Sequence, residues 1–91
     1  MIRLNVFIQV EAAKHAQLLD AAKELTACSL KEEGCIAYDI FESATRSDVL
    51  LICETWSNES SLKAHEATEP FTRLLGKIQE LGKVKLEKFN F

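Results

Sequence analysis

The sequence is poor in the two residues that most often interrupt regular structure. It contains one proline and three glycines among its 91 residues, whereas disordered and loop-rich chains are enriched in both. Hydrophobic residues make up 47% of the chain, a share typical of ordered globular domains. A chain of this length is expected to fold as one domain over residues 1–91.

Long apolar runs and an excess of basic residues are also absent. The longest uninterrupted apolar run, Val49 to Cys53, is far shorter than the roughly 20 residues that cross a bilayer. Met1 leads directly into a strand pattern, so we expect neither a membrane anchor nor a signal peptide. The net charge of −3 comes without the clustered Lys and Arg that bind phosphate backbones, which argues against a nucleic-acid partner.

The cysteines show none of the spacings that indicate a disulfide framework or a zinc site. Cys28, Cys35 and Cys53 are odd in number and form no CxxC pair or Cys/His cluster. We therefore expect no metal, and a reducing cytoplasm is the simplest location. A reactive thiol would need a depressed pKa that no nearby residue supplies, so the better interpretation is three small apolar residues in the core.

Three segments have the alternation and composition of β-strands. Residues 2–10 carry aliphatic side chains at every second position, which is the two-residue period of a strand. Residues 35–42 and 49–56 are rich in β-branched and aromatic residues, and the polar residues 43–48 connect them. We predict that these two segments form a hairpin.

Two regions have helical periodicity instead. From residue 12 to about residue 33 apolar side chains recur on one helical stripe, and Gly34 then ends the predicted helix. Capping residues precede a short helix from about Glu59 to His65. Pro70, which a first helical turn tolerates, restarts a helix that Gly82 ends.

The last nine residues return to a strand pattern with a break in it. Val84 and Leu86 share one parity, whereas Phe89 and Phe91 fall on the other. Because alternate residues of a strand point to opposite faces, this change predicts a bulge or a crossing onto another chain.

The predicted order is strand, helix, strand, strand, helix, strand, which fits an α+β antiparallel sheet with both helices on one face. The third strand is apolar on both parities from Val49 to Cys53, and the second strand adds Phe41. A half-solvated sheet would carry polar residues on its open face. We therefore expect an identical chain to cover that face, because closed two-fold pairing is the commonest symmetry.

An ordered set of short motifs spans nearly the whole chain. It consists of SxxEEGCxxY at residues 29–38, ExW at residues 54–56, LxxH at residues 62–65, and Phe71. In these motifs the chain resembles the antibiotic biosynthesis monooxygenase family, in particular its quinol monooxygenase-like members. The resemblance implies a ferredoxin-like βαββαβ fold that pairs into a dimeric α/β barrel.

The resemblance implies more than one activity, and fold alone does not decide among them. Several relatives oxygenate phenolic or quinol substrates without metal or flavin, others degrade haem, and one branch isomerises a phosphorylated autoinducer-2 sugar. Haem-degrading members carry a histidine four residues after the position of Phe71, where this chain has Leu75. We therefore expect a monooxygenase of a small aromatic or quinol substrate that needs no cofactor. An isomerase of a small phosphorylated carbonyl compound and a non-catalytic small-molecule-binding module are the alternatives.

His65 is the candidate catalytic residue. Imidazole titrates near neutrality and could take a phenolic proton from a substrate held between helix and sheet. An electron-rich phenolate can pass an electron directly to dioxygen, so the protein must mainly deprotonate, orient and shield it. The alternative is that His65 caps or hydrogen-bonds the break before Pro70.

Four further residues are predicted to shape the substrate pocket. Glu54 lies among apolar strand residues, where a carboxylate needs a partner or has a raised pKa. It could orient His65, bind a substrate hydroxyl, or make a purely structural hydrogen bond. Trp56 and Tyr38 can form an aromatic wall, with the Tyr38 hydroxyl as donor to an oxyanion, although core or interface positions explain both as well. Phe71 follows the apolar stripe of the last helix and is interpreted as core that doubles as pocket lining.

Overall fold

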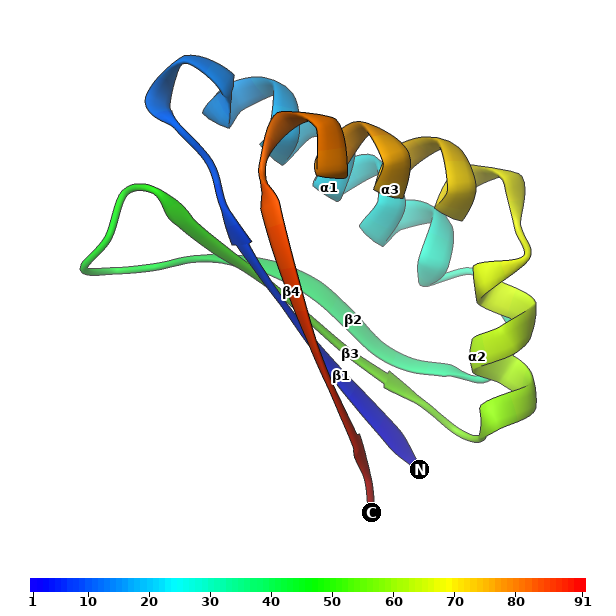
Figure 1. Ribbon diagram of the computed structural model, residues 1–91. Helices are drawn as coiled ribbons and strands as arrows, with labels where there is room; N and C mark the ends of the chain where they lie inside the picture. Colours follow the sequence, from blue (N-terminus) through cyan, green and yellow to red (C-terminus); the bar gives the residue numbers. More distant parts are fainter.

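The computed structural model describes residues 1–91 and contains one four-stranded antiparallel sheet with helices on one face (Figure 1). Its strands pair in the order β2-β3-β1-β4, with the bounds β1 Ile2–Gln9, β2 Cys35–Glu42, β3 Val49–Trp56 and β4 Lys83–Asn90. The helical elements are the short 3-10 helix η1 Ala12–Lys14, α1 His15–Ser29, α2 Glu59–Glu66 and α3 Glu69–Leu81. This arrangement confirms the predicted ferredoxin-like α+β fold.

The β2–β3 hairpin is confirmed with the predicted bounds, because local signals fix it at both ends. The hydroxyl of Ser43 accepts hydrogen bonds from the backbone N–H groups of Thr45 (3.3 Å) and Arg46 (3.1 Å). Such Ser-centred turns satisfy the backbone groups that a strand leaves behind. The connection therefore folds tightly and returns the chain antiparallel.

The first helix is shorter than predicted and ends at Ser29 instead of near residue 33. Leu30 is 55% exposed. Its apolar side chain therefore does not pack against the sheet and cannot stabilise a further helical turn. Gly34 does not act as the helix stop. It lies in the turn that enters β2, with a φ of 84°, in the left-handed region that favours glycine.

Helices α2 and α3 begin at the capping residues that the sequence supplies. Asn58 accepts a hydrogen bond from the N–H of Ser61 (2.8 Å), and Thr68 accepts one from the N–H of Phe71 (3.3 Å). Each cap satisfies a backbone donor that the first turn leaves free. Pro70 lies in the first turn of α3, as expected, so the predicted break between the two helices is confirmed.

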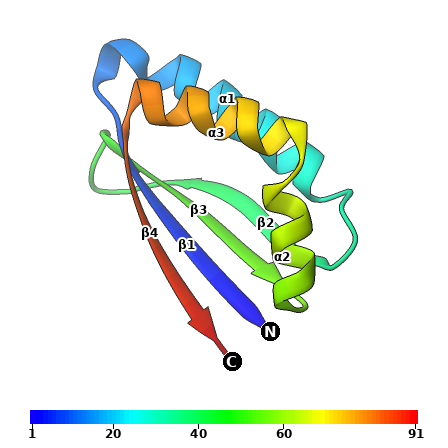
Figure 2. The same cartoon turned by 45° about the vertical axis from the view of Figure 1, so that its right-hand side comes forward.

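The hydrophobic core lies between the sheet and the pair α1 and α3, which run side by side over it (Figure 2). Alternate residues of β1 and β3 form the sheet side of the core, and residues of the two helices form the other side. Among the residues that are almost fully buried, the sheet contributes Leu4, Ile8, Leu50 and Ile52, and the helices contribute Leu18, Leu25, Leu74 and Ile78. Burying each such side chain contributes roughly 1.5–3 kcal/mol. Helix α2 lies at one end of this sandwich (Figure 2), where it faces the ends of β2 and β3.

The predicted bulge in the last strand is wrong. Strand β4 pairs with β1 without interruption, from Ile2 opposite Asn90 to Gln9 opposite Lys83. The apolar residues of the tail instead divide between the two faces of a regular strand: Val84 packs against the core, and Phe89 is opposite Arg3 on the helix-free face. The irregularity that the structure does contain is in β2, between residues 35 and 37.

The helix-free face of the sheet carries an apolar row across three strands. Leu51 is opposite Phe41 on one side and Phe7 on the other, and the two phenylalanines are 50% and 39% exposed. Polar residues lie beside this row, including Asn5 and Glu87, which are opposite each other. None of the helices combines the length and the apolar composition that a membrane-spanning helix requires.

Candidate functional site

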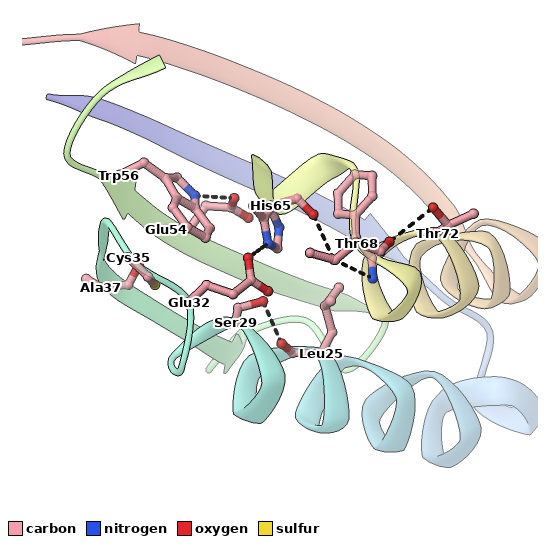
Figure 3. Close-up of polar contacts among 11 residues, drawn as sticks. Leu25, Ser29, Glu32, Cys35, Ala37, Glu54, Trp56, His65, Thr68 and Thr72 are labelled. Carbon is pink, nitrogen blue, oxygen red and sulfur yellow. Dashed lines mark hydrogen bonds and ion pairs between the residues drawn. The ribbon is translucent and has the colours of Figure 1, made fainter. Parts of the chain in front are cut away.

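The imidazole of His65 is almost completely buried, with 1% of its side chain exposed, near the C-terminal end of α2 (Figure 3). Its Nδ1 atom lies 2.8 Å from Oε1 of Glu32. The break between α2 and α3 also holds the residue, because the hydroxyl of Thr68 donates a hydrogen bond to the His65 carbonyl (2.8 Å). Both backbone and ring of His65 are therefore fixed from outside its own helix.

Three aromatic rings surround the imidazole. The ring centre of Trp56 lies 4.4 Å from that of His65, Phe71 lies 5.0 Å away in an edge arrangement, and Tyr38 lies 5.9 Å away. These three residues come from β3, α3 and β2 and are far apart in the sequence. The fold thus brings three of the predicted pocket residues into contact with the predicted base.

The Nε2 atom of His65 has no hydrogen-bond partner, and it is the one buried side-chain nitrogen or oxygen in the structure with this property. Buried polar atoms are nearly always paired, because leaving one unpaired costs free energy. An unpaired nitrogen on a buried histidine is therefore a candidate for contact with a ligand.

A cavity of about 220 Å³ lies beside His65, between the helices and the sheet. Tyr38, Glu54 and Phe71 line it together with apolar residues of β1, α3 and β4. An apolar cavity of roughly 150 Å³ accommodates benzene, so this one has room for a single substituted ring. Four hollows are larger, at about 460, 450, 320 and 270 Å³, and none of them contains a predicted site residue.

Glu54 is buried in β3 and has both features that the sequence predicts for it, a partner and a raised pKa. Trp56 Nε1 donates a hydrogen bond to Glu54 Oε1 (2.9 Å). Burial raises the pKa of Glu54 to about 7, and the negative charges of Glu66 and Glu32 act in the same direction, while the hydrogen bonds from Trp56 and nearby Tyr38 oppose the rise. Near neutral pH this carboxyl can therefore donate or accept a proton.

Tyr38 and Cys35 are kept in their protonated forms. Burial and the adjacent carboxylate of Glu54 raise the pKa of Tyr38 well above its usual range. The Tyr38 hydroxyl is therefore a hydrogen-bond donor at any physiological pH. Burial also raises the pKa of Cys35, which makes its thiol a poor nucleophile. All three cysteines are free and only partly buried, so the predicted apolar role fits them only in part.

Trp56 does not line the cavity. It is fully buried and packs against His65 on one side while its indole nitrogen holds Glu54 on the other. The structure thus places Trp56 in contact with both titratable groups, as a support for both. No group of three or more His, Cys, Asp or Glu side chains is positioned to hold a metal ion.

Glu32, the partner of the His65 ring, was not predicted from the sequence. The predicted first helix ran through residue 32, which assigned Glu32 to a helix end with no role of its own. Glu32 lies instead in the turn between α1 and β2, and it contacts a residue 33 positions away. The one signal that could have found it was the acidic pair in the SxxEEG motif.

Comparison with known families and curated proteins gives one consistent result. Residues 1–76 match the family described as antibiotic biosynthesis monooxygenase. The Bacillus subtilis (strain 168) protein named "Putative monooxygenase YcnE" is 32% identical over 87 residues, which cover 96% of this chain and 92% of that protein.

Solved structures give the same fold over the whole chain. A Bacteroides thetaiotaomicron protein, described as of unknown function and "Possible Oxidoreductase", is 62% identical with a TM-score of 0.98, over 99% of this chain and 96% of that one. A conserved protein of Methanosarcina mazei is 26% identical with a TM-score of 0.93, over 98% and 90% of the two chains. SnoaB of Streptomyces nogalater, described as a cofactor-independent oxygenase, is 11% identical with a TM-score of 0.88, over 99% and 91%. At that identity the last likeness concerns the fold alone.

Proposed function

The chain belongs to the antibiotic biosynthesis monooxygenase family, and from this premise we propose that it is a cofactor-independent monooxygenase of a small aromatic or quinol substrate. The family supports a monooxygenase-like function in general. The observation that carries the specific proposal is that His65 lines an apolar cavity and that its buried Nε2 atom has no hydrogen-bond partner. A neutral imidazole nitrogen in that position can accept a phenolic proton.

His65 acts as the base that starts the reaction. Removing a proton from the substrate hydroxyl gives an electron-rich phenolate, which transfers an electron to dioxygen. The overall change is SH2 + O2 → SO + H2O, so the substrate itself supplies the electrons that reduce the second oxygen atom to water. The protein must hold the phenolate in place and exclude bulk water, and the ten hydrophobic residues that line the cavity suit that task.

The other cavity residues bind and orient the ring. In this proposal the hydroxyl of Tyr38, which the raised pKa keeps protonated, turns its proton from Glu54 to the developing oxyanion. Glu54 binds a second substrate hydroxyl in this proposal, which is supported by the fact that Glu54 and Tyr38 line the same cavity. Phe71 lies edge-on to His65 and can pack against the aromatic ring of the substrate.

The proposal is tested by oxygen uptake with a graded series of substrates. The cavity of about 220 Å³ favours one-ring hydroquinones over two-ring naphthoquinols and three-ring anthrones, in that order of turnover. His65→Ala is expected to lower kcat by roughly 10²–10⁴-fold, the usual contribution of a general base, and to leave the fold intact. Full activity of this variant, or turnover that continues without oxygen, would refute the proposal.

A second candidate function is the isomerisation of a small carbonyl compound. The observation that favours it is the presence of two proton-transfer groups on one cavity, His65 and the Glu54 carboxyl with its pKa of about 7. One group could remove a proton from carbon while the other protonates the carbonyl oxygen. Anaerobic turnover of a phosphorylated small sugar by the wild type would select this function. Saturable binding of an unchanged ligand would indicate a non-catalytic module.

The family relationship also bears on assembly, and we propose that a second copy of the chain covers the helix-free face of the sheet. The apolar row formed by Phe41, Leu51 and Phe7 is contiguous and carries no helix. Rows of this kind on an exposed sheet mark protein interfaces. Sedimentation velocity at micromolar concentration is expected to give a dimer, and a stable monomer would contradict this proposal.

A further inference from the structure

The single hydrogen bond of the His65 ring runs to Glu32. Figure 3 shows the carboxylate of Glu32 reaching from the turn after α1 to the imidazole. The Glu32 side chain is 20% exposed and that of His65 is 1% exposed, so this pair lies at the edge of the core with the histidine on the inner side. Solvent can reach Glu32, but it does not reach the ring.

The contact determines which ring nitrogen carries the proton. An ionised carboxylate only accepts hydrogen bonds, so a bond of 2.8 Å to Glu32 places a proton on Nδ1. In a neutral imidazole the lone pair is then on Nε2, the atom with no partner in the structure. In the opposite tautomer the Nδ1 lone pair would face the carboxylate, and a buried Nε2–H would have no acceptor.

The backbone around Glu32 is built to hold this position. Gly34 ends the turn with a φ of 84°, and a Cβ atom there would collide with the side chain of Ser61 in α2. The Gly34 carbonyl accepts a hydrogen bond from the N–H of Ser57 (2.9 Å), and the N–H of Glu32 donates to the Ser29 carbonyl (3.0 Å). The turn is thus docked against the helix that carries His65.

We propose that Glu32 is a positioning residue that fixes His65, which lines the cavity, in the tautomer with its proton on Nδ1 and its lone pair on Nε2. When a substrate hydroxyl gives its proton to Nε2, the resulting imidazolium lies directly against the Glu32 carboxylate, which stabilises the new positive charge. The catalytic part of this inference rests on the proposed function. The tautomer itself does not, and it can be measured without any substrate.

The tautomer is tested by long-range ¹H–¹⁵N correlation spectra of the imidazole rings at pH 7.5. The chain has two histidines, and a His15→Gln variant assigns the signals. In the wild type, Nδ1 of His65 is expected to show the shift of a protonated nitrogen and Nε2 that of an unprotonated one. Glu32→Gln is expected to give a mixture or the reverse, because an amide can either accept from or donate to Nδ1.

The matched control is Glu33→Gln, an exposed carboxylate next along the chain, which should leave the His65 spectrum unchanged. If Glu32→Gln does not fold, Glu32→Asp replaces it, since its shorter side chain also breaks the 2.8 Å contact. A wild-type His65 protonated at Nε2, or a tautomer that neither Glu32 variant changes, would overturn the proposal.

Activity gives the second readout once a substrate has been found. Glu32→Gln is expected to lower kcat at least about tenfold with little change in KM, as found when the carboxylate that orients a catalytic histidine is replaced by an amide. Unchanged kcat in a variant with an altered tautomer would overturn the role of Glu32 while leaving His65 as the base. Loss of activity in His65→Ala alone would then support only the proposed function.

Discussion

Replacement of Glu54 by glutamine should change the free energy of unfolding by an amount that depends strongly on pH. The glutamine side chain has the same shape and keeps an oxygen that can accept the hydrogen bond from Trp56 Nε1 (2.9 Å in the wild type). It removes only the ability to ionise. The Glu54→Gln variant therefore isolates the free energy of placing a negative charge among the apolar residues of β3.

The magnitude follows from the pKa of the carboxyl in the two states. Burial raises the pKa of Glu54 from 4.5 to about 7 in the folded protein, so the folded state binds the proton more tightly than the unfolded state. The stabilisation from this proton is fully present below pH 4.5 and is lost as the pH rises through 7. A difference of about 2.5 pKa units corresponds to roughly 3 kcal/mol.

Urea denaturation of both proteins from pH 4.5 to pH 8.5, at one fixed protein concentration, tests this prediction. The two unfolding free energies should be nearly equal at pH 4.5. At pH 8.5 the Glu54→Gln variant should be the more stable by roughly 3 kcal/mol. Glu80→Gln is the control, because Glu80 is exposed on α3. If the difference in unfolding free energy between wild type and Glu54→Gln did not change with pH, the raised pKa of Glu54 would be refuted.

Two further substitutions test the turn and the open sheet face. Gly34→Ala should lower the free energy of unfolding by roughly 1–3 kcal/mol. The φ of 84° is unfavourable for alanine, and the side chain of Ser61 occupies the space that the new Cβ atom would need. Thermal unfolding should show the loss, whereas Gly76→Ala, in a helix with open space around it, should be neutral or stabilising. Phe41→Glu should shift a dimer to monomers in sedimentation velocity, and Lys77→Glu on α3 should not.

Each of these two predictions can be contradicted by a specific result. Equal melting temperatures for Gly34→Ala and the wild type would mean that the turn after α1 adjusts freely, and the fixed position of Glu32 would then lose its support. A Phe41→Glu protein with the sedimentation coefficient of the wild type would mean that the apolar row on the helix-free face takes no part in assembly.

Local sequence signals were sufficient for most of the fold. The hairpin and the restart at Pro70 were predicted correctly because turn and capping residues lie beside the elements that they delimit. The end of α1 and the regular course of β4 were not predicted correctly. Both depend on which surfaces find a packing partner, as shown by the exposed Leu30 and by Phe89 on the open face.

The candidate site also has residues that could be predicted from the sequence and a contact that could not. His65, Tyr38 and Phe71 could be proposed from their residue types and the family motifs, and the fold brings them together. The contact between Glu32 and His65 could not be proposed, because it joins a turn to a helix that lies 33 residues further along the chain. Without that contact, nothing in the residue pattern distinguishes the two nitrogens of the imidazole.

The proposed function requires that His65 acts as the base of an oxygen-dependent reaction. Turnover of a hydroquinone under ¹⁸O2, with mass spectrometry of the product, measures this most directly. The wild type is expected to place one labelled oxygen atom in each product molecule and the other in water, and His65→Ala is expected to form almost no labelled product. Product that forms without label, or that takes its oxygen from H2¹⁸O, would contradict the proposed oxygenase function.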